Sequence, residues 1–154
     1  MKAFEKVIGY EDIKRELMQV VDQIHNKEIY ESLGAKMPRG LLLHGAPGLG
    51  KTLLANCLIE ESGLPVFTLR RTKAGNDFMN DITETFHRAA DSAPAIVFLD
   101  DMDKFANEDS NHRDAEEYVA VQAAIDGVKE TDVFVLATVN KMVKLPASLF
   151  RSGR

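Results

Sequence analysis

The chain has 154 residues, of which 24 are acidic and 19 are basic, so its net charge is −5. This charge gives no bulk electrostatic reason to expect nucleic acid or an anionic membrane as a partner. No apolar run approaches the roughly 18 residues of a membrane span, and a single cysteine excludes an intrachain disulfide. We therefore expect one domain of ordinary size in the cytoplasm, or on the cytoplasmic face of a membrane if further sequence anchors it.

The first half of the chain contains two predicted helices and one predicted strand. Apolar residues at helical spacing predict an amphipathic helix whose inward face consists of Ile13, Leu17, Val20, Val21 and Ile24. An apolar run at 40–44 predicts a strand, and a helix is predicted at 51–62, ending before Gly63. Cys57 lies in an apolar stretch of that helix, which favours a buried thiol over a reactive one.

The second half continues the alternation of strands and helices. Strands are predicted at 66–69, 95–100 and 133–138. A helix is predicted from Asn76 or Asp77 to the break at Ala93-Pro94, and another at 114–126, before Gly127. The inward residues of the first of these two helices are Met79, Ile82, Phe86 and Ala90.

Alternating strands and helices predict an α/β domain with a parallel sheet. Ligands of such sheets bind at the carboxyl ends of the strands. We therefore expect the functional residues to follow His44, Leu99 and Thr138.

Residues 45–52 read Gly-Ala-Pro-Gly-Leu-Gly-Lys-Thr and match the phosphate-loop pattern G-x-x-x-x-G-K-[ST] without a mismatch. Glycines allow the backbone to curl so that successive N–H groups point at phosphate oxygens, and the following helix directs its positive end at the same anion. Lys51 is then expected to bridge the β- and γ-phosphates, and the Thr52 hydroxyl to bind Mg²⁺. The alternative is a glycine-rich turn that happens to contain Lys-Thr, but the strand before it and the helix after it favour the phosphate loop.

Two carboxylates follow the predicted strand at 95–100. Asp100, at the tip of a buried strand, is interpreted as a second magnesium site residue, and a solvated turn or helix cap is the alternative. Asp101 is interpreted as the residue that polarises the attacking water, although aspartate is one methylene shorter than glutamate. Asp103 is expected to be a surface or capping residue.

These segments resemble the AAA family of the AAA+ superfamily. Residues 45–52 resemble its Walker A motif and residues 96–103 its Walker B motif. Residues 7–14, 33–40, 137–140 and 145–154 are similar to other family segments, so the resemblance covers almost the whole chain. It is strongest to the subgroup that contains the FtsH-like metalloproteases and the Cdc48-like unfoldases.

The resemblance implies a three-layer α-β-α P-loop NTPase core that binds ATP or ADP with Mg²⁺. It implies four strands here, without the family's fifth strand and helical lid, so that the strand at 40–44 lies at an edge of the sheet. It also assigns nucleotide contacts to Ile8, Gly9 and the residues of the loop and first helical turn: Pro47, Gly48, Leu49, Gly50, Lys51, Thr52 and Leu53.

Three further polar residues gain a role from the resemblance. Asn140 corresponds to a sensor beside the γ-phosphate, and a turn-forming asparagine is the alternative. Arg151 and Arg154 correspond to arginine fingers that act on ATP bound by the next subunit of a homo-oligomeric ring, expected to be hexameric. Without the resemblance, these two would be interpreted as solvated arginines.

The sequence departs from the family at two sites. Asp101 stands where the family has a catalytic glutamate, which favours slow turnover. The segment 70–78 is basic and lacks the aromatic–hydrophobic–glycine pore triplet, so it is interpreted as a solvated charge run, with Phe78 packed under the following helix.

We thus expect the full-length protein to be an ATPase that remodels a protein partner, and the 154-residue chain alone to bind nucleotide with weak or no hydrolysis. A nucleotide-controlled assembly module with little turnover is the alternative, and a nucleic-acid-dependent ATPase is disfavoured by the acidic net charge.

Overall fold

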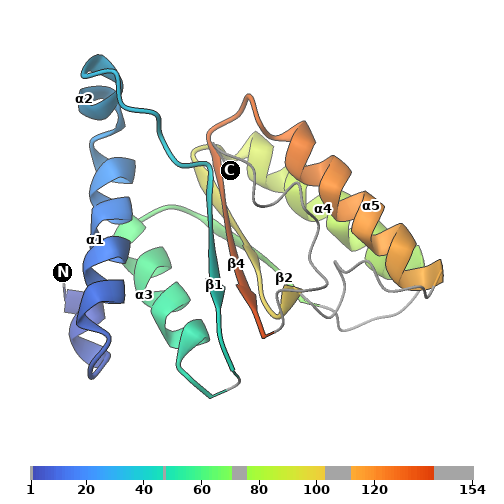
Figure 1. The fold of residues 1–154 in the computed structure, drawn as a ribbon. Coiled ribbons are helices and arrows are strands. Elements are labelled where there is room, and N and C mark those ends of the chain that lie inside the picture. The colour runs from blue at the N-terminus through green and yellow to red at the C-terminus, as the bar shows by residue number, and fades with distance from the viewer. Residues whose placement is uncertain (1, 47, 71–75, 103–111, 141–154) are drawn as a thin grey trace.

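The computed structural model describes residues 2–46, 48–70, 76–102 and 112–140. In this part of the chain, four parallel strands form a sheet in the order β1-β4-β3-β2 (Figure 1). The strands are β1 (Gly40–His44), β2 (Val66–Leu69), β3 (Ala95–Leu99) and β4 (Val133–Val139). The helices are the 3₁₀ helix η1 (Lys2–Lys6) and the α-helices α1 (Glu11–His25), α2 (Lys27–Ser32), α3 (Lys51–Ser62), α4 (Asn76–Asp91) and α5 (His112–Gly127).

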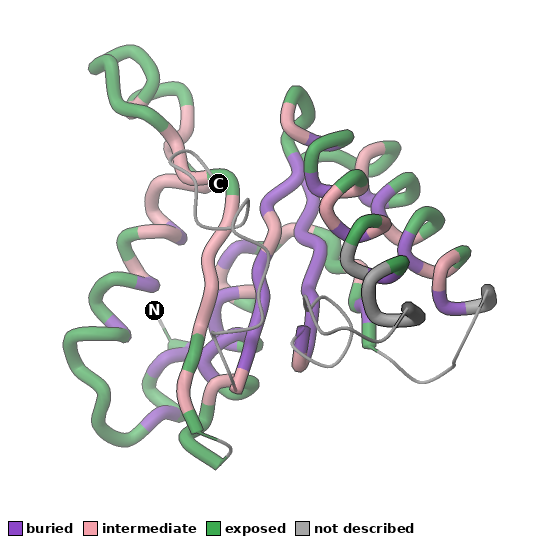
Figure 2. The backbone as a smooth tube through the Cα atoms, turned by 45° about the vertical axis from the view of Figure 1, so that its right-hand side comes forward, coloured by how far each residue is buried: buried purple, intermediate pink, exposed green. Residues whose placement is uncertain are grey.

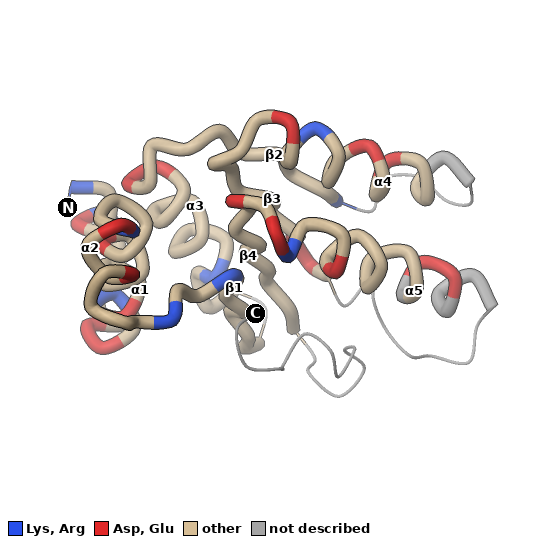
Figure 3. Tube along the Cα trace, turned by 90° about the horizontal axis from the view of Figure 1, so that it is seen from above, with Lys and Arg blue, Asp and Glu red and all other residues tan. Residues whose placement is uncertain are grey.

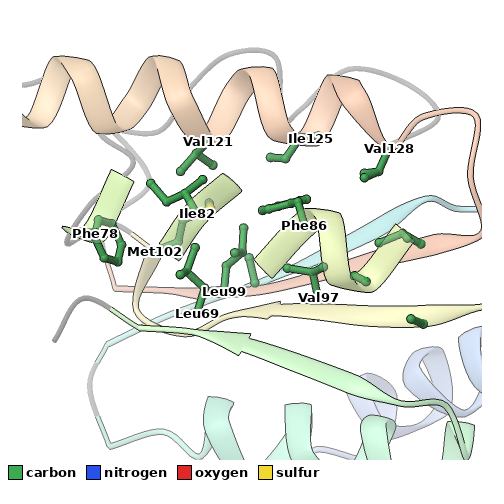
Figure 4. Packing of buried hydrophobic residues seen from close by; sticks show 14 of the residues in the cluster. Leu69, Phe78, Ile82, Phe86, Val97, Leu99, Met102, Val121, Ile125 and Val128 are labelled. Atoms are coloured by element: carbon green, nitrogen blue, oxygen red, sulfur yellow. The ribbon is translucent and has the colours of Figure 1, made fainter. Parts of the chain in front are cut away.

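Helices cover both faces of the sheet and confirm the predicted three-layer α/β fold (Figure 1). Successive side chains of a strand point to opposite faces, so each strand contributes to two cores. Ile96 and Phe98 of β3 pack with η1, α1 and α3, whereas Val97 and Leu99 pack with α4 and α5. Figure 4 shows Ile82 of α4 lying among the side chains of this second core, between α5 and the sheet.

Burial decreases from the centre of the sheet to its edge. All residues of β3 are buried, whereas β1 is mostly of intermediate burial (Figure 2). This confirms that β1 is an edge strand of the described sheet, where it pairs with β4 alone. None of the four described strands contains a Lys, Arg, Asp or Glu, and charges of both signs lie on the helices and connections (Figure 3).

The predicted strands and long helices are confirmed with small changes at their ends. β3 ends at Leu99, so Asp100 lies in the turn after the strand, and β4 continues to Val139. α5 begins at His112 and includes Gly127, and the six-residue helix α2 was not expected from the sequence. Among the described residues, no helix is long and apolar enough to cross a bilayer.

One residue of the predicted inward face of α1 lies elsewhere. Leu17 and Val21 are buried as expected, but the Ile13 side chain is exposed. The neighbouring Lys14 is turned inward instead, because its ammonium donates a hydrogen bond to the Val7 carbonyl oxygen at 2.8 Å. The prediction for Ile13 was therefore wrong.

Cys57 of α3 is buried against η1, as predicted. Its thiol donates to the Ala3 carbonyl oxygen at 3.2 Å, and burial raises the pKa of the Cys57 thiol. Because the thiolate is the reactive form, the native protein should react with Ellman's reagent at pH 8 about 100-fold more slowly than the protein unfolded in guanidinium chloride. Stoichiometric labelling of the native protein within the mixing time would contradict the described packing of η1 on α3.

Candidate nucleotide-binding site

The parallel register brings the carboxyl ends of all four strands to one edge of the sheet. His44 of β1 is level with Val139 of β4, and Leu99 of β3 is level with Ala137 of β4. Hydrogen bonds continue this alignment beyond the strands, from Gly45 N–H to the Val139 carbonyl oxygen at 3.3 Å. In the same way, Asp100 N–H donates to the Leu69 carbonyl oxygen at 3.2 Å. The residues that follow the strands therefore lie side by side.

The loop between β1 and α3 contains glycines whose backbone conformation suits an anion-binding loop. Gly48 and Gly50 have φ angles of +83° and +86°, a region that side chains with a Cβ rarely adopt. Gly50 is the N-cap of α3, and no side chain caps the helix there. The first N–H groups of a helix have no intrahelical partner, so those of α3 are free to bind an anion.

The Lys51 ammonium reaches back over this loop. It donates to the carbonyl oxygens of Gly45 at 2.7 Å and Ala46 at 2.9 Å. These bonds hold a positive charge against the loop that is expected to receive phosphate. The contact of Lys51 with phosphate itself stays a prediction.

The Asp100 carboxylate is the centre of the polar contacts at this edge. It is largely buried, and its Oδ1 accepts a hydrogen bond from the Thr138 hydroxyl at 2.9 Å. The Thr52 hydroxyl lies 3.4 Å from the same oxygen. The structure thus brings together Thr52 and Asp100, the two residues that the sequence assigned to magnesium.

Two members of this network, Arg70 and Thr138, were not predicted. Arg70 Nε donates to Asp100 Oδ2 at 2.9 Å, and Thr138 Oγ1 accepts from Asp101 N–H at 3.0 Å. Arg70 directly follows β2, so the carboxyl-end argument applied to that strand could have identified it. The interpretation of 70–78 as a solvated charge run obscured this signal: the Arg70 side chain is exposed, as that interpretation expects, but it is also paired with Asp100. Residues 71–75 lie outside the described part of the chain.

Asp101 and Asn140 both lie at this edge of the sheet. Asp101 has a φ angle of +51°, an uncommon backbone conformation for a residue other than glycine. Such conformations cluster at functional sites, where the surrounding contacts maintain them. Asn140 directly follows β4 and is half-buried. Their predicted actions on water and on the γ-phosphate remain predictions.

The N-terminal segment before α1 presents an exposed apolar side chain. Ile8 is 94% exposed, while the hydrogen bond from the Lys14 ammonium to the Val7 carbonyl oxygen holds the segment against α1. Leu49 and Leu53 are also exposed. These apolar surfaces, and Gly9 beside Ile8, are accessible for the contacts that the resemblance assigns to them.

Comparison with known proteins identifies the family. Residues 41–154 match the family model described as "ATPase family associated with various cellular activities (AAA)". The chain belongs to the AAA family. Membership indicates nucleotide binding and ATPase chemistry at the level of the family.

The chain is also similar to proteins named as ATP-dependent zinc metalloproteases. It is 36% identical to the ATP-dependent zinc metalloprotease FtsH 4 of Sphaerobacter thermophilus, over 98% of the chain and 25% of that relative. It is 35% identical to the ATP-dependent zinc metalloprotease FtsH of Leptotrichia buccalis, over 98% of the chain and 21% of that relative. The chain thus spans about a quarter of the length of these relatives.

The residues at the AAA site fit a magnesium–nucleotide complex. Hydroxyl and carboxylate oxygens are the ligands that Mg²⁺ prefers, and Mg²⁺ at nucleotide sites takes few protein ligands because phosphate and water complete its shell. Thr52 and Asp100 provide one such oxygen each at the open end of the glycine loop. Among the described residues, no group of three or more His, Cys, Asp or Glu could hold a metal ion.

Several predicted residues lie outside the described part of the chain. Pro47, Asp103, Arg151 and Arg154 belong to this group, and their assignments stay predictions. Phe78 is described and fully buried at the start of α4, as predicted (Figure 4).

The Thr138 hydroxyl is expected to stabilise the site measurably. Replacing Thr138 with Val keeps its shape but leaves Asp101 N–H without this acceptor and Asp100 without this donor. We expect the free energy of unfolding, measured by urea denaturation, to fall by about 1–3 kcal/mol. The control is Thr131→Val, which removes a hydroxyl bonded to the Val128 carbonyl oxygen at 2.7 Å in an exposed turn, and its loss should be clearly smaller. Equal losses would argue against a special role of the Thr138 hydroxyl.

Proposed function

We propose that this chain binds ATP with Mg²⁺, with weak or no hydrolysis by the 154-residue chain alone, and that the full-length protein hydrolyses ATP to remodel or unfold a protein partner. The observation that supports the proposal most is the position of the Thr52 hydroxyl, 3.4 Å from the buried Asp100 carboxylate and directly after the glycine loop. Family membership supports the ATPase reaction in general. The remodelled partner is proposed from the resemblance alone.

Different residues bind the phosphates, the metal and the base of the nucleotide. Backbone N–H groups of the loop and of the first turn of α3 bind phosphate oxygens, and Lys51 exchanges its carbonyl contacts for the β- and γ-phosphates. Thr52 and Asp100 hold the metal, which when bound neutralises charge on the phosphates. Ile8 and Gly9 contact the base.

Water activation is assigned to Asp101 and Asn140. Asp101 accepts a proton from the attacking water, and the Asn140 amide orients that water or contacts the γ-phosphate. Arg151 and Arg154 complete the site of the neighbouring subunit in a homo-oligomeric ring, which we propose to be hexameric. Guanidinium groups supplied in this way stabilise the charge of the transferring phosphoryl group. We propose a cytoplasmic location, or the cytoplasmic face of a membrane.

A nucleotide-controlled assembly module is the second candidate. Asp101 supports it, because its carboxylate is one methylene shorter than the glutamate of the family and its backbone is fixed at a φ of +51°. In this case, ATP would order a ring or a docking surface with little turnover. The acidic net charge of −5 disfavours nucleic acid as the stimulating partner.

Removal of the Lys51 ammonium tests nucleotide binding. We expect Lys51→Ala to abolish ADP binding in isothermal titration calorimetry, because the loop loses its only side-chain cation. The control is Lys6→Ala, which removes an exposed ammonium paired with Glu60 at 3.3 Å and should leave ADP affinity unchanged. Undiminished affinity of Lys51→Ala would contradict the assignment of the phosphate loop.

The replacement Asp101→Glu separates the two candidate functions. The ATPase proposal expects robust turnover in the full-length wild-type protein and a change of less than about tenfold in kcat for Asp101→Glu. Very slow wild-type turnover that rises by about a hundredfold or more in the variant would favour the assembly module. Steady-state phosphate release, measured at saturating ATP and Mg²⁺, distinguishes these results.

A further inference from the structure

Arg70 places a guanidinium group on the carboxylate that is assigned to magnesium. Its Nε lies 2.9 Å from Asp100 Oδ2, in an ion pair between the ends of the neighbouring strands β2 and β3. The proposed ATP reaction gives Arg70 no role, and nothing in the phosphate-loop pattern includes it. The contact therefore calls for an explanation of its own.

The two partners of this ion pair differ in their freedom to move. The Asp100 side chain is 11% exposed and is held through Oδ1 by the Thr138 hydroxyl at 2.9 Å. The Arg70 side chain is 56% exposed, and its Nε donates to Asp100 Oδ2. A long, largely solvated side chain loses little by moving, so the guanidinium can leave while the carboxylate stays in place.

A cation on Asp100 affects the affinity for another cation at the same carboxylate. Oδ1 faces Thr138 and Thr52, and Oδ2 accepts a hydrogen bond from Arg70. Mg²⁺, or a water bound to it, must approach a carboxylate whose negative charge Arg70 already balances. The guanidinium charge repels the incoming ion whichever carboxylate oxygen the ion approaches, and the hydrogen bond from Arg70 occupies one acceptor position of Oδ2.

We propose that Arg70 competes with Mg²⁺ for Asp100 and thereby sets the Mg²⁺ concentration at which the site takes up magnesium–nucleotide. The guanidinium keeps the buried carboxylate paired and oriented, and it moves off Oδ2 when the metal complex binds. This inference rests on the proposed function, because it assumes that Asp100 serves a magnesium–nucleotide complex. It adds a residue that determines how strongly nucleotide binding depends on Mg²⁺.

The test measures a magnesium midpoint rather than turnover. ADP affinity is determined by fluorescence of a methylanthraniloyl derivative at a series of Mg²⁺ concentrations, and the midpoint is the concentration at half of the full change in affinity. For Arg70→Gln, which keeps much of the shape and removes the charge, we expect the midpoint to fall by about three- to tenfold. Arg70→Lys keeps the charge and should stay within about twofold of wild type.

Arg15→Gln is the matched control for the change in net charge. The Arg15 side chain is exposed and pairs with Asp12 at 3.6 Å, on α1, so its removal should leave the midpoint unchanged. Circular dichroism and a thermal unfolding curve establish that each variant is folded. An unchanged or raised midpoint for folded Arg70→Gln would overturn the inference, and a raised one would show that Arg70 helps Asp100 to receive the metal.

Failure of this inference can be told apart from failure of the proposed function. If wild-type protein binds ADP and Lys51→Ala does not, the phosphate loop stands, and the Arg70→Gln midpoint alone decides whether Arg70 competes with Mg²⁺. If wild-type protein does not bind ADP at any Mg²⁺ concentration, the proposed function fails and the inference fails with it.

Discussion

Parallel pairing of the four strands is the constraint on which the candidate site depends. The register of β1 with β4, and of β3 with both β4 and β2, aligns the carboxyl ends of all strands. A shift of one residue would turn each affected side chain to the opposite face and separate the residues that follow the strands. The two apolar cores fix this register because β3 is buried on both faces. The polar network is thus positioned by packing that lies outside it.

Asp100, directly after β3, is hydrogen-bonded to residues at the ends of β2 and β4. It receives hydrogen bonds from Thr138 of β4 and Arg70 after β2, and it lies beside Thr52 of α3. A buried carboxylate is stable only when its charge is paired and hydrogen-bonded. The same contacts that stabilise Asp100 also determine where a metal could reach it. Stability and metal binding are therefore properties of one set of hydrogen bonds, and both depend on the sheet register.

The sequence predicted the elements better than it predicted the contacts between them. Short, mainly apolar runs identified all four described strands, because a parallel sheet covered by helices on both faces consists mainly of apolar residues. The phosphate loop was recognised equally well, because its pattern lies within eight consecutive residues of the sequence. Arg70 and Lys14 were missed because their partners, Asp100 and Val7, are brought to them by tertiary structure. From sequence alone, a charged side chain in a polar segment is predicted to be solvated, because its partner on the neighbouring strand is known only from the register of the sheet.

We infer that the glycine loop and Asp100 form one site for a magnesium–triphosphate group. A crystal structure with Mn²⁺ and a non-hydrolysable ATP analogue tests this most directly, because Mn²⁺ replaces Mg²⁺ and is located by its anomalous signal. We expect the phosphates within the bend formed by residues 45–52 and the anomalous peak beside the Thr52 hydroxyl and the Asp100 carboxylate. Phosphates bound elsewhere, or a metal remote from both oxygens, would contradict the account.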